Sequence, residues 1–418
     1  MNSFGEYFTY RGSELVCEGV ALRTVAAEFG SPLYVYTERG FVERFQEIDR
    51  AFSGMEHLIC YSIKSNPNIN LLKIMTAHGS GMDVVSGGEI YRALAAGADP
   101  RKIVFAGVGK TDEEIGYALD TGILMFNCES MLEIGEINRI ALGKNMIADI
   151  AIRINPDVDA NTHQYITTGK KENKFGIAIE HLKENLDALK GFTGVRLRGI
   201  HAHIGSQIAR VEPFIDALDR QIVLIGELRG LGFDSIENIN LGGGFGIRYK
   251  DEESFPVERL AGEIGKRIAP LGLRLIVEPG RYLSGNNGVL IVKVLYKKKS
   301  GGKTFLITDG AMNDLIRPSL YNAYQHILNC VLREGTEKAD VVGPVCESGD
   351  FFAKDREVSL TGQGDYLAVM SAGAYGMSMA SRYNSRRLPA EALIMPDGRA
   401  RLIRARDLYE DLIAQERV

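Results

Sequence analysis

The chain has few cysteines, and no two of them form a C-x-x-C pair. The cysteines are Cys17, Cys60, Cys128, Cys330 and Cys346. Their odd number and wide spacing exclude a disulfide framework and a zinc knuckle. A reducing compartment, the cytoplasm, fits this pattern best.

Long basic runs and an apolar N-terminal segment are also lacking. The formal net charge is -5, and the one notable basic run covers residues 297–299. So short a run cannot neutralise many phosphates, which argues against a nucleic-acid partner. The polar N-terminus, with Glu6 and Arg11, has no apolar core of the kind found in signal peptides and membrane spans. We therefore expect no membrane association.

Strand-like apolar runs recur through the first two thirds of the chain, with helical patterns between them. They cover residues 58–63, 81–85, 103–106, 124–126, 150–154, 197–203, 236–241 and 273–277. About eight strands that alternate with helices predict a closed parallel (β/α)8 barrel of the TIM type. Two of the helices have capping-box patterns at their starts, at residues 111–114 and 130–133.

After residue 281 the pattern changes to extended runs separated by glycine-rich turns. These runs cover residues 289–294, 304–307, 358–360 and 366–370, and they predict a mainly antiparallel β domain. The N-terminal residues lack barrel periodicity and are expected to join this domain. The predicted organisation is an N-terminal segment 1–30 that joins the β domain, a barrel 31–280, and a C-terminal β domain 281–418 that carries substrate residues.

One connection is too long for a compact barrel. Between residues 155 and 175 lie about twenty residues without clear periodicity. We therefore expect residues 167–174 to form either a mobile lid or a disordered surface insertion. The strand end at Arg153 leads directly into this segment, which favours the lid.

Four polar strings each follow one of the strand-like runs. They cover residues 61–67, 201–207, 241–246 and 278–281. In a parallel barrel the strand ends gather on one face, so these strings are expected to converge. They supply a lysine for a Schiff base, glycine amides for a phosphate, a carboxylate for a pyridine nitrogen and a flat ring for stacking. Together they predict a pyridoxal phosphate pocket.

Several of these residues have simpler interpretations. Most lysines are solvated surface charges, but Lys64 ends an apolar run just before Pro67, which places its ammonium at the barrel mouth. The glycines at 242–244 could form only a tight turn, although Arg281 nearby favours a bound phosphate. Of two carboxylates around the turn at 86–88, Glu89 could merely complement a helix N-terminus, whereas Asp83 on the strand is the better site candidate.

A metal site is the main alternative class. His201 and His203, two apart on a predicted strand, would share one face and could be metal ligands of a barrel hydrolase. The other histidines fall at positions from which a three-histidine site is hard to assemble. One of the pair could also be a plain core histidine.

The four strings, in this order, resemble those of fold type III pyridoxal phosphate decarboxylases, a group related to alanine racemase, over nearly the whole chain. Later strings at residues 317–321, 343–350, 372–376 and 379–384 are similar to those of the diaminopimelate decarboxylase family. Ornithine and arginine decarboxylases share the first set of strings but differ in the second.

The resemblance implies a role for each matching residue. Lys64 would form the Schiff base, His203 would stack on the cofactor ring, and Cys346 would donate a proton across the interface of a homodimer with shared active sites. Glu89 and Arg153 would support the site. The implied cofactor-binding residues are Lys64, Asp83, His203, Ser206, Gly242, Gly243, Gly244, Glu278, Gly280, Arg281 and Tyr375. The implied substrate-binding residues are Arg281, Arg317, Tyr321, Glu347 and Tyr375, without a metal.

The implied reaction is decarboxylation of meso-2,6-diaminopimelate to L-lysine and carbon dioxide, the last step of lysine biosynthesis. A carboxylate at Glu278 keeps the pyridine nitrogen protonated, which favours decarboxylation over racemisation, because racemases of this fold place an arginine there. Arg317 and Glu347 would bind the carboxylate and ammonium at the remote end of the substrate.

Three alternatives stay open at this point. The first is a related decarboxylase for ornithine, lysine or a carrier-linked amino acid, in which Arg317 would only cap a turn before Pro318. The second is a metal-dependent hydrolase. The third is a small cofactor-carrier barrel, but such proteins lack a second β domain.

Overall fold

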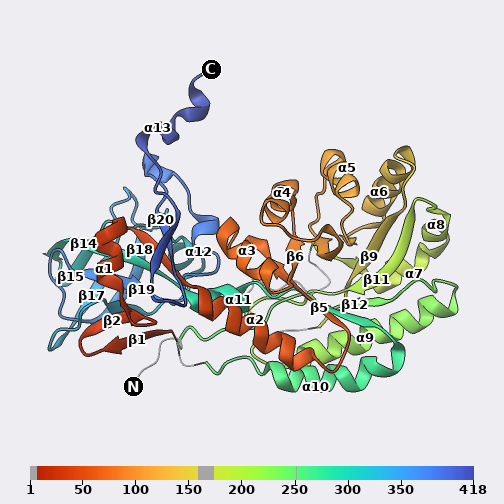
Figure 1. Cartoon of the computed structure of the whole chain (residues 1–418), viewed down its shortest axis with the longest axis horizontal. Coiled ribbons are helices and arrows are strands. Elements are labelled where there is room, and N and C mark those ends of the chain that lie inside the picture. Colours follow the sequence, from red (N-terminus) through yellow and green to blue (C-terminus); the bar gives the residue numbers. More distant parts are fainter. Residues whose placement is uncertain (1–6, 159–173, 251) are drawn as a thin grey trace. The chain divides into compact units, whose positions relative to one another are not determined.

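The chain divides into two compact units, which the computed structural model describes over residues 7–158, 174–250 and 252–418 (Figure 1). The first comprises Met1–Glu43, Arg248–Glu252 and Leu283–Val418, and we call it the β unit. The second comprises Arg44–Ile247 and Glu253–Tyr282, and we call it the barrel unit. Apart from Lys174, the predicted lid lies outside the described residues.

The barrel unit contains a closed ring of parallel strands. In ring order they are β5 (His57–Ser62), β6 (Gly81–Val84), β7 (Ile103–Phe105), β8 (Met125–Cys128), β9 (Ala148–Asn155), β11 (Val195–His201), β12 (Asn238–Asn240) and β13 (Arg274–Val277). The ring closes because β13 pairs with β5 and β8 pairs with β9, both in parallel. The predicted (β/α)8 barrel is therefore confirmed.

Helices connect successive barrel strands and lie outside the ring (Figure 1). They include α3 (Ile69–Ala77), α4 (Gly87–Ala95), α5 (Asp112–Thr121), α6 (Met131–Gly143), α9 (Glu212–Gly230) and α10 (Val257–Ile268). Shorter elements are α7 (Ile179–Glu184), α8 (Leu186–Gly191) and β10 (Ile177–Ala178), which pairs with β9.

One of the two predicted capping boxes is wrong in part. At α5 the Thr111 hydroxyl and the Glu114 carboxylate each satisfy a backbone amide of the other residue, as predicted. At α6 Ser130 does accept from the Glu133 amide, but the Glu133 carboxylate accepts from the Glu129 amide at 2.7 Å and pairs with Lys110 at 2.5 Å. A buried lysine that needs a counter-ion has displaced the local contact.

The β unit is built around a mainly antiparallel sheet. Its order is β18 (Phe351–Ser359), β17 (Thr336–Val342), β15 (Lys303–Thr308), β14 (Gly288–Ser300), β4 (Leu33–Thr37), β20 (Ala390–Ile394) and β21 (Ala400–Arg404), while β19 (Tyr366–Val369) pairs with β14 and β16 (Ile327–Asn329). The β15–β17 and β4–β20 pairs are parallel, and the others are antiparallel. The predicted fold class is confirmed.

The N-terminal segment joins the core of this sheet. Strands β1 (Phe8–Arg11), β2 (Glu14–Cys17) and β3 (Val20–Ala21) form a small antiparallel sheet, and α1 (Leu22–Phe29) follows it. Phe8, Leu15 and Leu22 pack in one buried cluster with strand residues such as Val35 and Ile291. Each large buried side chain contributes about 1.5–3 kcal/mol of transfer free energy, which fixes the segment to the sheet.

Three more short helices, α11 (Arg281–Ser284), α12 (Arg317–Tyr321) and α13 (Tyr409–Leu412), complete the chain, together with α2 (Glu38–Phe52), which precedes the barrel. Within the described residues, we find no helix with the length and apolar character needed to cross a membrane.

Candidate active site

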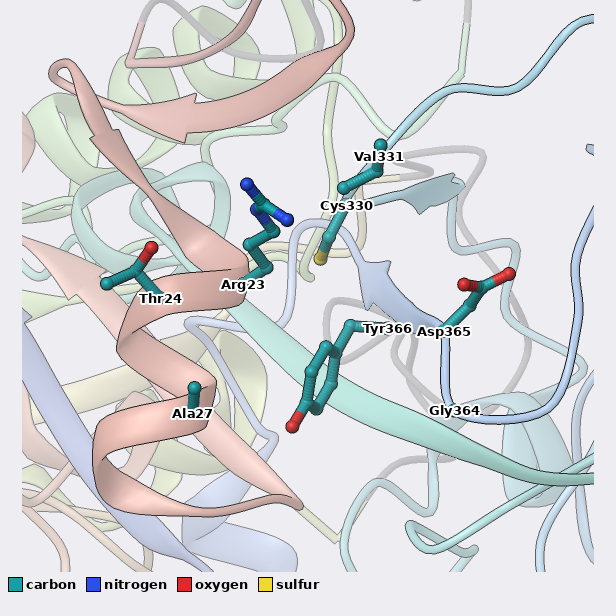
Figure 2. Close-up of a pocket in the computed structure, with 8 residues that line it drawn as sticks. All are labelled: Arg23, Thr24, Ala27, Cys330, Val331, Gly364, Asp365 and Tyr366. Atoms are coloured by element: carbon teal, nitrogen blue, oxygen red, sulfur yellow. The ribbon is translucent and has the colours of Figure 1, made fainter.

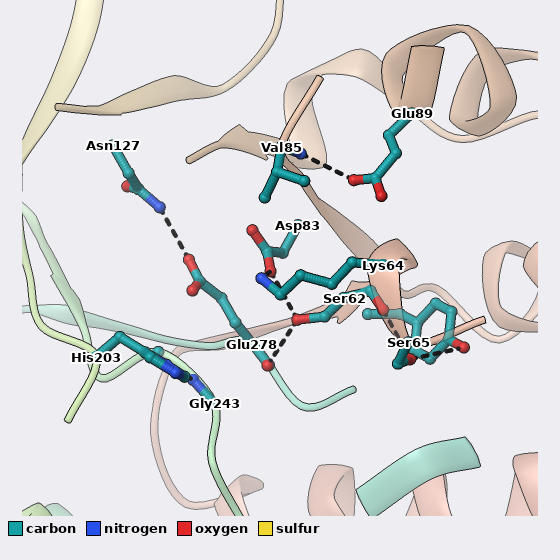
Figure 3. Close-up of polar contacts among 12 residues, drawn as sticks. Ser62, Lys64, Ser65, Asp83, Val85, Glu89, Asn127, His203, Gly243 and Glu278 are labelled. Carbon is teal, nitrogen blue, oxygen red and sulfur yellow. Dashed lines mark hydrogen bonds and ion pairs between the residues drawn. The ribbon is translucent and has the colours of Figure 1, made fainter. Parts of the chain in front are cut away.

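Lys64 lies just beyond the end of a barrel strand. Strand β5 ends at Ser62, and a short 3-10 turn, Ile63–Ser65, carries the lysine one step past the predicted strand end. Its Nζ donates to Asp83 Oδ2 at 2.8 Å, and Ser62 Oγ donates to the same oxygen at 2.6 Å (Figure 3). The lysine side chain is 38% exposed, whereas the Asp83 carboxylate that accepts from its amine is fully buried.

Burial dominates the electrostatics of Asp83. It raises the pKa of this carboxyl, the Lys64 ammonium opposes the rise, and the negative charge of Glu278 adds to it. A carboxylate that is costly to bury alone is thus matched to one lysine. The pair fixes where the amine points.

Glu278 follows β13 and is buried in a polar network. Its Oε1 accepts from Asn127 Nδ2 at 2.9 Å and from Asn240 Nδ2 at 2.6 Å, and its Oε2 lies 3.2 Å from His201 Nε2. Burial alone would raise the pKa of Glu278, but His201, Lys64 and the Asn240 amide outweigh it and hold the pKa well below its usual range. The carboxylate is therefore ionised.

The prediction that His201 and His203 share one strand face is wrong. Strand β11 ends at His201, so His203 lies on the following loop and the alternation of a strand no longer applies. His203 Nδ1 accepts from the Gly243 amide at 3.1 Å. Burial, followed by the positive charges of Arg153 and Lys64, places the pKa of His203 well below its ordinary value, so the ring is neutral. No group of three or more metal-ligating side chains occurs within the described parts of the chain.

The glycine string after β12 approaches other backbone closely. A Cβ on Gly243 would lie 2.1 Å from the Glu278 carbonyl oxygen, and one on Gly244, whose φ is +111°, would lie 2.3 Å from the Gly205 carbonyl oxygen. Only glycine fits at either position. The Ile208 amide donates to the Gly244 carbonyl at 2.9 Å, which joins the two loops. Beside them Arg281 Nη2 donates to Ser206 Oγ at 3.3 Å.

Two further charged groups flank the barrel site. Arg153, at the end of β9, pairs with the buried Glu129 at 2.6 Å. Glu89 accepts from the Val85 amide at 2.8 Å, and burial raises its pKa to about 7 (Figure 3). Glu89 lies in the first turn of α4 and satisfies the amide of Val85, which lies two residues before the helix.

The structure brings the predicted barrel residues together and adds partners that the sequence did not reveal. Asn127, Asn240 and Glu129 were missed, since no local pattern distinguishes them. The one available signal was their position, in the last residues of β8 and β12 or just after β8.

In the β unit, Arg317 begins α12 and is buried. Its Nη1 donates to the Tyr249 hydroxyl at 2.7 Å, and the guanidinium carbon lies 5.0 Å from the centre of the Tyr249 ring. Tyr249 was also missed, because it lies far from Arg317 in the sequence. The arginine contacts an aromatic partner rather than serving only as a cap before Pro318.

The remaining predicted residues of the β unit lie on or beside loops. Cys346 and Glu347 are exposed on the loop that follows β17, and Tyr321 ends α12. Tyr375 lies after β19 with a φ of +55°. The roles assigned to these residues remain predictions.

A pocket of about 370 Å³ also opens in the β unit, lined by residues that include Arg23, Cys330 and Asp365 (Figure 2). None of the lining residues is a predicted site residue. Its charges are already matched, because Arg23 pairs with Glu14 at 2.5 Å and Asp365 pairs with Arg333 at 2.6 Å.

The donor set of the barrel unit fits pyridoxal phosphate. The amine of the partly exposed Lys64, the buried carboxylate of Glu278 with its lowered pKa and the neutral ring of His203 match the aldehyde, the pyridine nitrogen and the ring face of the cofactor. Arg281, Ser206 and the glycine backbone provide donors suited to a phosphate.

Known proteins share both the sequence and the fold. Residues 38–285 match the family described as "Pyridoxal-dependent decarboxylase, pyridoxal binding domain". The chain is 45% identical to the diaminopimelate decarboxylase of Aquifex aeolicus, over 99% of this chain and 98% of that one. The chain belongs to the diaminopimelate decarboxylase family. The Pseudomonas aeruginosa member is 44% identical, over 98% of each chain.

Solved structures of this family superpose closely. Diaminopimelate decarboxylase from Helicobacter pylori, complexed with L-lysine, has a TM-score of 0.91 at 41% identity and covers 94% of this chain and 99% of its own. A lysine decarboxylase from Selenomonas ruminantium has a TM-score of 0.81 at 22% identity, covering 90% of this chain and 96% of its own, and shares the fold.

Proposed function

We propose that this enzyme decarboxylates meso-2,6-diaminopimelate to L-lysine and carbon dioxide, as the last step of lysine biosynthesis, with pyridoxal phosphate as cofactor. The observation that carries the proposal is the buried carboxylate of Glu278, which accepts hydrogen bonds from two asparagines and lies next to His201. Similarity over the full length to diaminopimelate decarboxylases supports the substrate.

Pyridoxal phosphate, when bound, accepts the electron pair left behind as carbon dioxide departs. Glu278 keeps the ring nitrogen protonated, because an opposite charge at hydrogen-bond distance favours the charged form. Lys64 binds the cofactor through its Nζ, and Asp83 orients that amine. Neutral His203 offers a flat face for stacking that adds no competing charge.

Phosphate binding falls to the loops that follow β11, β12 and β13. Arg281, Ser206 and the backbone of Gly243 and Gly244 supply donors, and Gly242 and Gly280 permit the close approach of these loops. Tyr375 is assigned to the phosphate as a further hydroxyl donor.

Substrate choice falls to the β unit. Arg317 binds the remote carboxylate, Glu347 binds the remote ammonium, and Tyr321, Tyr375 and Arg281 add donors. Once the bond to carbon dioxide has broken, the Cys346 thiol gives its proton to the carbon that carried the carboxylate, and solvent protonates the thiolate. The enzyme works as a homodimer in the cytoplasm, with Cys346 supplied by the neighbouring subunit.

Carbon dioxide release from a panel of amino acids tests this proposal. The purified enzyme, saturated with pyridoxal phosphate, is offered meso-diaminopimelate, L-lysine, L-ornithine and L-arginine. We expect kcat/KM for meso-diaminopimelate to exceed that for each of the others by about a hundredfold or more, the scale of losing a charge-assisted contact. A preference for L-ornithine or L-lysine would overturn the substrate assignment.

A further inference from the structure

Two consecutive side chains hold two consecutive residues of the loop that carries Cys346. The Cys346 amide donates to Asn384 Oδ1 at 3.0 Å, and the Tyr383 hydroxyl donates to Glu347 Oε2 at 2.9 Å. Tyr383 and Asn384 belong to the string at 379–384, to which no role has been given. We call these two residues the clip.

The rest of the loop is fixed by Asp350 at its base. The buried Asp350 carboxylate accepts from the amides of Met312 and Val345, both at 2.7 Å. Inside the loop the Glu347 amide donates to the Val345 carbonyl at 2.8 Å. These bonds fix the backbone of the loop. Cys346 and Glu347 themselves are exposed, and the clip contacts the Cys346 amide and the Glu347 carboxylate.

The clip residue Asn384 has an uncommon backbone conformation. Its φ is +54°, in the left-handed region that residues other than glycine and asparagine rarely adopt. Ser385 beside it has a φ of +52°. Uncommon conformations persist where the surrounding contacts require them, and here the conformation accompanies the bond from Asn384 to the Cys346 amide.

We propose that Tyr383 and Asn384 are positioning residues that hold Cys346 and Glu347 in the geometry needed for proton return and substrate binding. The inference rests on the proposed function of those two residues. Proton transfer is sensitive to displacements of about 1 Å, so a thiol on a loop needs a fixed backbone. The Tyr383 hydroxyl donates to Glu347 Oε2. This bond leaves Oε1 to accept from the substrate ammonium.

Variants at Asn384 test the first half of the clip. Asn384→Gly removes the acceptor but tolerates the positive φ, Asn384→Asp keeps an acceptor oxygen, and Ser385→Gly is the control at the neighbouring position. We expect Asn384→Gly to lower kcat on meso-diaminopimelate about tenfold with little change in KM, Asn384→Asp to restore most of it, and Ser385→Gly to match the wild type. Equal kcat in wild type and Asn384→Gly would overturn this half.

Alkylation gives a readout that does not depend on activity. In the single chain Cys346 is exposed whereas the other four cysteines are buried, so we expect iodoacetamide to label Cys346 first. We expect the rate of labelling, followed by mass spectrometry at one fixed pH, to change about threefold or more in Asn384→Gly. An unchanged rate would overturn the clip even in an active decarboxylase. If the labelling rate changes but the enzyme does not decarboxylate diaminopimelate, the role of the clip is supported and the proposed function is wrong.

Tyr383→Phe tests the second half. The change removes one hydroxyl from an exposed position, so the fold should be unaffected. We expect KM for meso-diaminopimelate to rise about fivefold while kcat and the labelling rate of Cys346 stay within twofold. An unchanged KM, or a fall in kcat as large as that in Asn384→Gly, would overturn a separate role for Tyr383.

Discussion

The barrel unit and the β unit hold their functional side chains in different ways. In the barrel unit Glu278 directly follows a strand, is buried, and accepts hydrogen bonds from Asn127 and Asn240 of two other strands. In the β unit Cys346 and Glu347 are exposed on a loop. The charged group proposed for the chemistry therefore lies at a strand end, whereas Cys346 and Glu347, proposed for proton return and substrate binding, lie on a surface loop of the kind that tolerates variation.

Removing the barrel amine should have the largest effect. Lys64→Ala should lower the rate of carbon dioxide release about a thousandfold or more and abolish the visible absorption of the covalently held cofactor, since no other amine replaces it. Lys73→Ala, at an exposed lysine of the same unit, serves as the control. If borohydride reduction of the wild-type enzyme fixes the cofactor to another lysine, the assignment is contradicted.

Neutralising the buried carboxylate should come next. Glu278→Gln keeps the shape and the bonds from the two asparagines but removes the charge opposite the ring nitrogen. We expect kcat to fall about a hundredfold, the scale for losing one preorganised electrostatic contact, with a shifted cofactor absorption spectrum. A variant with kcat within threefold of the wild type would show that the network serves the fold alone.

Substrate choice should depend on Arg317 in the β unit. Arg317→Ala should lower kcat/KM for meso-diaminopimelate about a hundredfold and affect L-lysine, if it reacts, much less, because only the former has a remote carboxylate. The cofactor spectrum should not change. Equal losses on both substrates would place Arg317 in the chemistry rather than in selection.

Tyr249→Phe provides a graded comparison for that variant. It keeps the ring beside the guanidinium and removes the hydroxyl bonded to it. We expect kcat/KM for meso-diaminopimelate to fall about fivefold, a value between those of the wild type and Arg317→Ala.

The smallest effect concerns stability and pH. Burial raises the pKa of Glu89 from 4.5 to about 7, so between these values the folded state binds more protons than the unfolded state. Stability from this group is therefore full below pH 4.5 and is lost as the pH rises through about 7. Glu89→Gln should remove this contribution to the pH dependence of stability. The free energy of unfolding in urea, variant minus wild type, should therefore increase from pH 5 to about 8. A parallel pH dependence in the two proteins would contradict the shift.

The sequence located the residues whose neighbours along the chain carry information. Lys64 before Pro67, and Glu278 before Arg281, follow apolar runs, and the barrel was predicted from those runs. The N-terminal segment was also assigned to the β domain, because it lacked the barrel periodicity.

The sequence could not locate contacts made across the barrel. Asn127 and Asn240 lie on strands far apart along the chain, and only closure of the barrel brings both to Glu278. The error at His201 and His203 has a local cause: the strand ends at His201, two residues earlier than predicted, so His203 lies on the loop and no longer alternates with strand residues. The Ser130 capping box failed because Lys110, from another loop, competes for Glu133.

Subunit complementation tests most directly the claim that one decarboxylation site takes its amine from the barrel unit and its proton donor from the β unit of a neighbouring chain. Inactive Lys64→Ala and Cys346→Ala proteins are mixed, and exchange of subunits is verified by native mass spectrometry. In a statistical mixture half of the dimers are mixed and each has one intact site, so activity should recover to about a quarter of the wild-type value. Verified mixed dimers without activity would contradict the claim.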